Sequence, residues 1–269
     1  MTDSTKNLAL FCDFENIALG VRDANFTRFE IEGVLERLLV KGNIVVKKAY
    51  CDWERYKDFK RDMHEASFEL IEIPHVRQSG KNSADIRMVV DALDLCYTKA
   101  HVDTFVIISG DSDFSPLVSK LRENNKQVIG VGVKNSTSDL LIANCDEFIF
   151  YDDLVRASEP RKPNKKKTVR KETEEKGATG ITEAREEKAF ELVLETIVDL
   201  FSERSDEDKL WGSMVKQALK RRKPGFNETY HGFRSFGKLL EEMATRGLLT
   251  MDHDPKSGGY IITGVNQLV

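Results

Sequence analysis

The sequence predicts an α/β domain with a mostly parallel sheet, followed by a linker and a smaller winged-helix-like α+β domain. Short β-prone runs alternate with helix-length amphipathic segments through the first half of the chain. This alternation is typical of parallel strands whose connecting helices cover both faces of a sheet. A basic run and a second set of amphipathic segments follow. We expect the first domain at residues 1–155, a flexible linker at 156–182 and the second domain at 183–269.

The elements of the first domain are indicated by six β-prone runs and by two helices with a regular apolar stripe. The predicted strands cover 8–13, 43–51, 68–73, 104–109, 127–133 and 147–151. The predicted helices cover 28–42, where Gly42 would stop the helix, and 83–100. Their stripes contain Ile31, Val34, Leu35, Leu38 and Leu39 in the first, and Ile86, Val89, Val90, Leu93 and Tyr97 in the second.

A change of composition marks the linker. Residues 161–171 carry seven basic residues in eleven, and Val169 is the one apolar residue among them. Such a segment is typical of a flexible connection. Its positive charge could neutralise nucleic-acid phosphates without sequence preference. The segment could equally be a nuclear localisation signal or a tether that keeps the chain soluble.

The second domain is predicted to contain three helices and a hairpin. The helices cover 183–203, 210–222 and 229–247, with Gly247 as the stop of the third. β-prone segments on either side of the turn at 254–259 predict the hairpin. The order of these elements suggests a winged-helix variant of the helix-turn-helix fold. The first helix has an apolar stripe of Phe190, Val193, Leu194, Ile197, Leu200 and Phe201.

Composition narrows the class of protein. The hydrophobic fraction of 40% is enough for a sizeable core, and a net charge of −4 shows that any nucleic-acid-binding surface must be local. Four cysteines lie far apart without a CxxC pair, which predicts free thiols in a reducing compartment. We find no signal peptide and no apolar run of membrane-spanning length, so we expect a cytoplasmic protein without a membrane partner.

Four aspartates suggest a metal site. Asp13 ends the first predicted strand, Asp111 and Asp113 follow the fourth, and Asp85 lies in the first turns of a helix. The carboxyl ends of parallel strands meet at one edge of a sheet, where sites gather. Carboxylates crowded there suit Mg²⁺ or Mn²⁺, which could activate a water for phosphodiester hydrolysis. Each aspartate could instead serve a turn or a helix cap, and Asp113 is a fair N-cap candidate.

Motifs in the first domain resemble the NYN family, the LabA-like branch of the PIN-like nucleases. They are CDFENI, GKNSADIRMVVDAL, VIISGDSDFSPLVSKLRENNKQVIGVGV and SDLLIANCDEFIFYDDL, in that order over most of the domain. The resemblance implies a PIN-like α/β fold and metal-dependent cleavage of RNA. The family's acidic positions correspond to Asp13, Asp85, Asp111 and Asp113.

The same resemblance assigns further residues. Asn16 matches the asparagine of the family's DxxN, and Ser109 precedes its GDxD turn. Lys81 matches the lysine of the GK-x-x-x-D segment and could meet a phosphate, although a solvated loop lysine is an equal alternative. Asp91 lies far round the helix from Asp85, so we expect it to pack the helix or support a ligand rather than bind the same metal.

The second domain resembles an OST-HTH (LOTUS) domain in the stretch KRRKPGFNETYHGFRSFGKLLEEM. The resemblance implies RNA binding or docking of a protein partner. A basic run within it could contact RNA, or could be a solvated helix end. It consists of Lys220, Arg221, Arg222 and Lys223.

Together these features predict a metal-dependent ribonuclease that acts on single-stranded or structured RNA. Asp13, Asp85, Asp111 and Asp113 would bind Mg²⁺ or Mn²⁺, and Asn16 would orient a carboxylate, a water or the substrate. Ser109, Lys81 and the basic run would contact the substrate. The alternatives are an RNA-binding regulator without catalysis, a small-substrate metal-dependent phosphatase, and a protein-interaction adaptor. The oligomeric state does not follow from the sequence.

Overall fold

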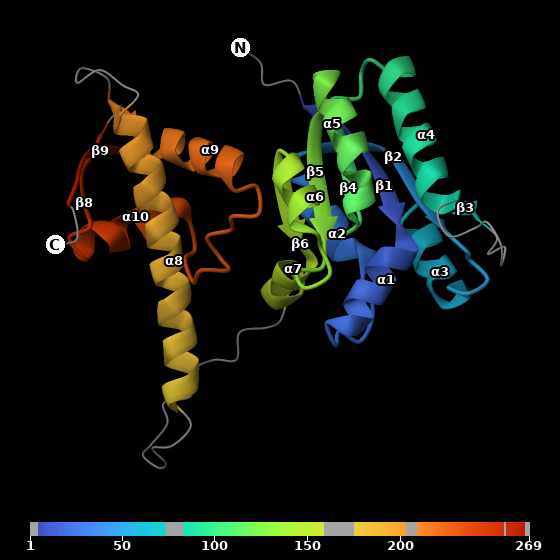
Figure 1. The fold of residues 1–269 in the computed structure, drawn as a ribbon, viewed down its shortest axis with the longest axis horizontal. Helices are drawn as coiled ribbons and strands as arrows, with labels where there is room; N and C mark the ends of the chain where they lie inside the picture. The colour runs from blue at the N-terminus through green and yellow to red at the C-terminus, as the bar shows by residue number, and fades with distance from the viewer. Residues whose placement is uncertain (1–4, 74–82, 159–174, 203–208, 256, 267–269) are drawn as a thin grey trace. The chain divides into compact units, whose positions relative to one another are not determined.

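The computed structural model describes residues 5–73, 83–158, 175–202, 209–255 and 257–266. Its contacts divide the chain into two compact units, Met1–Pro160 and Arg161–Val269. Each unit is described below by itself (Figure 1).

The first unit contains a six-stranded sheet in which every pairing is parallel, which confirms the predicted α/β class. The strand order is β3-β2-β1-β4-β5-β6, so β1 and β4 are neighbours at the centre. The strands are β1 (Lys6–Asp13), β2 (Gly42–Cys51), β3 (Glu69–Glu72), β4 (Thr104–Ile108), β5 (Gln127–Gly132) and β6 (Glu147–Phe150).

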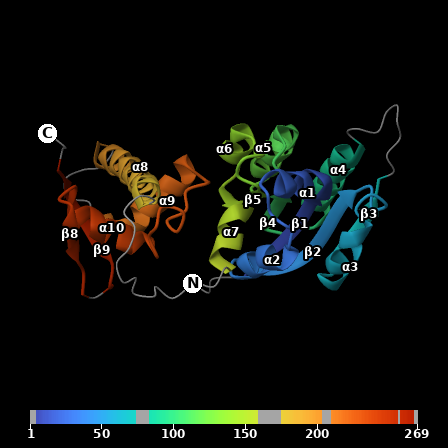
Figure 2. The ribbon, with the colours of Figure 1, turned by 90° about the horizontal axis from the view of Figure 1, so that it is seen from below.

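Helices cover both faces of this sheet (Figure 2). Alternate residues of β1 enter two cores, with Leu10 and Cys12 on one face and Ala9 and Phe11 on the other. The first face is covered by α1 (Phe14–Asp23), α2 (Ile31–Leu39), α3 (Lys57–Glu65) and α7 (Tyr151–Ser158). The second face is covered by α4 (Ser83–Thr98), α5 (Ser115–Glu123) and α6 (Asp139–Asn144), and the short 3-10 helix η1 (Ser112–Phe114) precedes α5.

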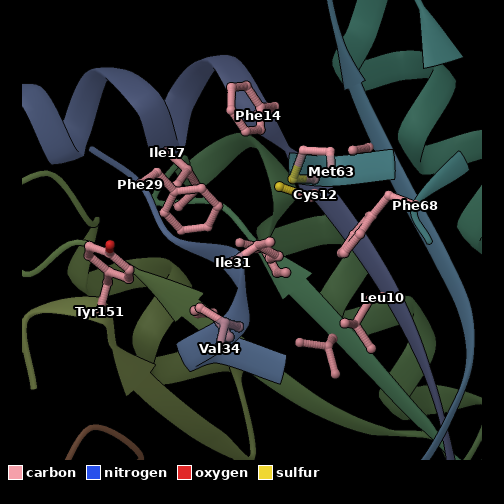
Figure 3. Packing of buried hydrophobic residues seen from close by; sticks show 14 of the residues in the cluster. Leu10, Cys12, Phe14, Ile17, Phe29, Ile31, Val34, Met63, Phe68 and Tyr151 are labelled. Carbon is pink, nitrogen blue, oxygen red and sulfur yellow. The ribbon is translucent and has the colours of Figure 1, made fainter. Parts of the chain in front are cut away.

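Phe14 and the rings around it fix the beginning of α1, and Figure 3 shows Phe14 among other buried residues of this core. Phe14 is fully buried, and its ring lies 5.0 Å from that of Trp53 and 5.1 Å from that of Phe59, between centroids. Phe14 directly follows Asp13, so this packing holds the chain where β1 ends and α1 begins. Trp53 belongs to the loop after β2, which is therefore held close to the same place.

Helix α4 buries a face that only partly overlaps the predicted apolar stripe, of which Val89 and Leu93 pack against the core. Ile86, Val90 and Tyr97 of that stripe are 63%, 55% and 65% exposed. The face against the sheet consists instead of Met88, Ala92 and Cys96, at a spacing of four residues. Small side chains let the helix approach the sheet closely, and hydrophobicity alone does not distinguish that face from one carrying larger apolar groups.

Gly42 begins β2 and does not end the preceding helix, as its position suggested. Helix α2 ends at Leu39, and Gly42 already pairs with Lys6 of β1. A Cβ atom at Gly42 would lie 2.2 Å from the carbonyl oxygen of Lys6. The glycine is therefore required by the close approach of two strands rather than by a helix stop.

The second unit has the helices and antiparallel sheet expected of a winged-helix-like domain. Its sheet has the order β7-β9-β8. Three sequence expectations were wrong in detail. The first helix begins at Glu175, inside the predicted linker 156–182, and residues 210–211 pair with β9 as a short strand. The last helix begins at Phe236, where the Ser235 hydroxyl caps it. Its described elements are α8 (Glu175–Ser202), β7 (Leu210–Trp211), α9 (Gly212–Arg222), α10 (Phe236–Thr245), β8 (Leu249–His253) and β9 (Tyr260–Val265).

The cysteines and the apolarity of the helices were also predicted from the sequence. All four cysteines are buried free thiols, as their spacing predicted. Within the described ranges no helix combines the length and the apolarity needed to cross a membrane.

Candidate functional site

The candidate site lies at the carboxyl edge of the sheet, where β1 and β4 end side by side. Cys12 pairs with Ile108 in the parallel ladder, so the next residues, Asp13 and Ser109, lie side by side where these strands end. Asp13 is 7% exposed and Ser109 is fully buried. Adjacent strands thus bring together two residues that are far apart in the sequence.

A network of hydrogen bonds ties the two strand ends together. The Ser109 hydroxyl donates to Oδ2 of Asp13 at 3.0 Å and accepts from the backbone N–H of Asp111 at 3.2 Å. The backbone N–H of Asn16 donates to Oδ1 of Asp13 at 3.3 Å, and Oδ1 of Asn16 accepts from the backbone N–H of Gly110 at 2.8 Å. Because Ser109 is buried and engaged in this way, it is placed to orient Asp13, whereas the sequence suggested a substrate contact.

Gly110 allows a second loop to close over this network. A Cβ atom at Gly110 would lie 2.7 Å from the backbone oxygen of Ser136 and 3.0 Å from Cα of Thr137. The carbonyl oxygen of Gly110 also accepts from the backbone N–H of Ser138 at 2.9 Å. The loop after β5 therefore packs directly on the turn between β4 and η1.

Asp111 and Asp113 differ in their local roles. The carboxylate of Asp111 caps η1 by accepting from the backbone N–H of Asp113 at 3.0 Å. The N-cap residue of α5 is Phe114, without a side-chain hydrogen bond. The alternative reading of Asp113 as a helix cap was therefore wrong, and capping does not account for its carboxylate.

Asp85 completes the acidic group from the first turn of α4. Partial burial raises the pKa of Asp85, and the charges of Asp111, Asp113 and Glu15 raise it further. Burial, followed by the charge of Asp85, raises the pKa of Asp13 from 3.8 to about 7. Asp85 thus lies within electrostatic reach of Asp13, Asp111 and Asp113, and the neighbouring charges disfavour the ionised forms of Asp13 and Asp85.

The donor chemistry of this group suits a hard divalent cation. Carboxylate oxygens are the preferred ligands of Mg²⁺ and Mn²⁺, and a cation would offset the mutual repulsion. Among the described residues, however, no three acidic, histidine or cysteine side chains are arranged to hold one ion. Mg²⁺ commonly keeps several waters and binds through one or two carboxylates plus phosphate oxygens, so the group fits an ion bound partly through water.

Two residues at this edge were not identified from the sequence. Glu15 follows Asp13 by two positions, and Nη1 of Arg55 lies 3.0 Å from its Oε1. Glu15 could have been noticed in the motif CDFEN, since it is the third residue of an acid-x-acid pattern. Arg55 carries no such signal, because only the pairing of β2 with β1 brings its loop beside Asp13.

Asp91 connects α4 to the sheet. Its Oδ2 accepts from the Tyr50 hydroxyl at 3.0 Å and lies 3.3 Å from Nζ of Lys48, both on β2. Its Oδ1 accepts from Nε of Arg87 at 3.0 Å. These contacts are those of a helix-packing residue. Lys81, the other residue taken from this motif, lies outside the described residues.

The basic run of the second unit is partly used within the fold. Arg222 pairs with Glu195 at 2.8 Å and with Asp199 at 2.5 Å, both on α8. Nε of Arg221 has a long contact of 3.4 Å with the carbonyl oxygen of Gln217. Arg222 therefore joins α9 to α8, and the run Lys220–Lys223 is not a uniform set of RNA-facing cations.

Comparisons with known proteins place the chain among related sequences and structures. A family model described as NYN domain matches residues 7–152. An uncharacterised protein of Methanocaldococcus jannaschii is 27% identical over 164 residues, which are 60% of this chain and 65% of that protein. The meiosis regulator and mRNA stability factor 1 of Xenopus tropicalis is 24% identical over 165 residues, which are 61% of this chain and 10% of that protein.

A solved structure agrees with the fold. The crystal structure of a protein of unknown function from Vibrio parahaemolyticus matches with a TM-score of 0.51 and 27% identity, over 57% of this chain and 98% of that one. The curated relatives are matched over less than two thirds of their own length, and the vertebrate factor over about a tenth.

Proposed function

This chain belongs to the NYN domain family, and from that membership we propose that it is a metal-dependent ribonuclease. The observation that carries the proposal is the convergence of Asp13, Asp85, Asp111 and Asp113 at one edge of a PIN-like sheet, with raised pKa values for Asp13 and Asp85. Packing alone gives no reason to hold repelling carboxylates together, whereas a divalent cation does.

In this proposal the four aspartates hold Mg²⁺ or Mn²⁺, directly or through water. The bound ion would supply an activated water and stabilise the charge on a phosphodiester oxygen. Ser109 orients the Asp13 carboxylate through Oδ2. Asn16 accepts from Gly110 through Oδ1, which leaves its amide nitrogen to orient a water or the substrate.

RNA is the substrate class that the comparisons favour. The vertebrate relatives are named for mRNA stability, and they match this chain over 165 residues, 61% of its length. We propose that the second, LOTUS-like unit and the basic segment before it hold RNA or a protein partner. That role belongs to the proposal, since the vertebrate match covers only a small part of those proteins.

A non-catalytic RNA-binding regulator is the second candidate. The observation that favours it is the open arrangement of the carboxylates, since no three of the described acidic, histidine or cysteine side chains close around one point. Under this reading the acidic edge, formed by Asp13, Asp85, Asp111 and Asp113 where the strands end, would contribute to folding or regulation. The protein would then bind RNA without cutting it.

The deciding experiment is cleavage of a labelled single-stranded RNA with Mn²⁺, Mg²⁺ or EDTA. Wild type is compared with Asp111→Asn, which removes one carboxylate with little change of shape, and with Asp94→Asn on the exposed side of α4 as the control. We expect metal-dependent cutting by wild type and Asp94→Asn, and a loss of cutting in Asp111→Asn.

Two other outcomes would redirect the proposal. RNA binding without cutting under any metal favours the regulator. Hydrolysis of a chromogenic phosphomonoester without hydrolysis of RNA favours a small-substrate phosphatase.

A further inference from the structure

Arg55 is a cation held at the border of the acidic edge. Its loop is anchored, because Trp53 is buried against Phe14 and the backbone N–H of Arg55 donates to the carbonyl oxygen of Asp52 at 3.1 Å. The guanidinium pairs with Glu15, but its side chain stays 49% exposed. An exposed ion pair of this kind stabilises the fold only weakly, so the guanidinium can exchange Glu15 for a phosphate and bind it through two N–H groups.

A shallow hollow borders the acidic edge on its other side. It has a volume of about 650 Å³, within the range of roughly 300–1,000 Å³ that is usual for ligand sites. Its lining combines apolar groups, hydroxyls and one carboxylate. The lining residues are Ser112, Asp113, Ser115, Pro116, Ser119 and Leu140.

The composition of this hollow suits a nucleobase better than a phosphate. Pro116 and the 57% exposed side chain of Leu140 offer apolar surface for the face of a base. The hydroxyls of Ser112 and Ser119 can bond to the edge of a base, since a hydroxyl both donates and accepts. The described lining has no lysine or arginine, and the Asp113 carboxylate would repel a phosphate.

The order of the strands sets the distance between these two places. Arg55 follows β2, whereas the hollow lies beyond β4, on α5 and α6. Strands β2 and β4 are two inter-strand spacings apart, about 10 Å, and the hollow extends from the end of β4 to Leu140 of α6. The acidic group lies between them, at the ends of β1 and β4.

We infer that a single strand of RNA crosses the carboxyl edge of the sheet, with a backbone phosphate on Arg55 and a nucleoside in the hollow beside Leu140. This inference rests on the proposed function and adds to it the path and the orientation of the substrate. It assigns specific contacts to Arg55 and Leu140 and separates their roles, electrostatic for the first and apolar for the second.

The test uses the full chain and a short single-stranded RNA. Binding is measured on the cleavage-deficient Asp111→Asn background over a series of salt concentrations, and kcat and KM are measured for each variant without that substitution. Arg55→Gln is compared with Arg61→Gln, an exposed arginine on α3 that also pairs with one glutamate. Leu140→Ser is compared with Leu39→Ser, since Leu39 is 59% exposed and lies beside the amino end of β2.

We expect different signatures from the two variants. Arg55→Gln should weaken binding several-fold and reduce the slope of log K against log salt by about 0.7, the value for one phosphate of a single strand. Leu140→Ser should raise KM several-fold without changing that slope. Arg61→Gln and Leu39→Ser should stay within about twofold of the parent protein, as expected for surface positions away from the substrate.

The outcomes separate the inference from the proposed function. If wild type cuts RNA but Arg55→Gln and Leu140→Ser behave like their controls, the inference is overturned and the ribonuclease stands. If wild type neither binds nor cuts RNA, the proposed function fails and the inference fails with it. Thermal unfolding of each variant shows whether a loss reflects misfolding, and in that case Arg55→Lys and Leu140→Ala decide by the same criteria.

Discussion

The Ser109 hydroxyl donates a hydrogen bond of 3.0 Å to Oδ2 of Asp13, and this bond joins the ends of β1 and β4. Ser109 also accepts from the backbone N–H of Asp111, so one buried hydroxyl connects two of the four aspartates. The bond lowers the pKa of Asp13, against the larger effect of burial. Ser109 therefore supports both the geometry and the ionisation of the acidic edge.

Replacing Ser109 by alanine should destabilise the protein and impair metal binding. The substitution leaves the buried Asp13 carboxylate without one partner, a change that costs about 1–3 kcal/mol. It should also shift the pH at which metal binds to higher values, because it removes an interaction that favours ionised Asp13. Urea unfolding and metal titration by calorimetry at several pH values measure both effects.

Ser115→Ala is the matched control for that substitution. Ser115 is also a buried serine near the same edge, but its hydroxyl has no hydrogen-bond partner among the described residues. Its replacement should change the free energy of unfolding by much less than that of Ser109. Equal destabilisation by the two substitutions would contradict the role given to the Ser109–Asp13 bond.

The stability of the metal-free protein should fall as the pH rises from about 4 to about 7. In this window Asp13 is protonated in the folded state, where its pKa is about 7, and ionised in the unfolded state, where the pKa is near 3.8. The folded state therefore binds more protons, and each such group lowers the free energy of unfolding by at most about 1.4 kcal/mol per pH unit.

Asp13→Asn tests this dependence. Unfolding by urea in EDTA should show a smaller decline with pH for Asp13→Asn than for wild type, since asparagine does not titrate. Part of the decline should remain, because the pKa of Asp85 is also raised. Parallel curves for the two proteins would show that Asp13 is ionised in the folded state at low pH.

Asp91→Asn should lower stability and leave the chemistry largely intact. Asp91 holds α4 on β2 through Tyr50 and Lys48, and weakening these buried polar contacts should cost about 1–3 kcal/mol. At a temperature where the variant is folded, we expect cleavage of RNA within a few-fold of wild type. Asp85→Asn, on the same helix, should instead lose cleavage while remaining folded. A loss of cleavage by folded Asp91→Asn would place Asp91 in the chemistry.

In the second unit, Arg222→Gln and Arg221→Gln should have different effects. Arg222 joins α9 to α8 through Glu195 and Asp199, so its loss should lower the free energy of unfolding by about 1 kcal/mol. Among the described residues, Arg221 makes a weak contact with the main chain of its own helix, and its replacement should leave stability unchanged. Differential scanning calorimetry of the two variants checks this difference. Equal melting temperatures would show that the ion pairs contribute nothing measurable.

The strands of the first unit were predictable from sequence because each is a short apolar run with clear breaks on both sides. The face that α4 buries was not predictable. Ile86, Val90 and Tyr97 are large and apolar but exposed, whereas Met88 and the smaller Ala92 and Cys96 face the sheet. The helix packs where it can approach closely, and only the neighbouring strands decide which side that is.

The aspartates of the candidate site were predictable from the sequence, but the residues that contact and border them were not. Asp13, Asp111 and Asp113 follow apolar runs, and parallel strands must end at a common edge, so their proximity follows from local pattern and chain topology. Glu15 and Arg55 meet only because β2 pairs with β1. No local residue pattern in the sequence indicates a contact of this kind.

The sequence by itself determined the six strands of the first unit and the types of side chain available at the acidic edge, because each of these depends on residues close together in the chain. Only the tertiary structure decided which side chains contact one another. The Ser109–Asp13 bond, the Glu15–Arg55 pair and the Asp91–Lys48 contact each join segments that the strand order β3-β2-β1-β4 brings together. Their geometry depends on which strands are neighbours and on how closely helices approach the sheet, and neither is a property of any local segment.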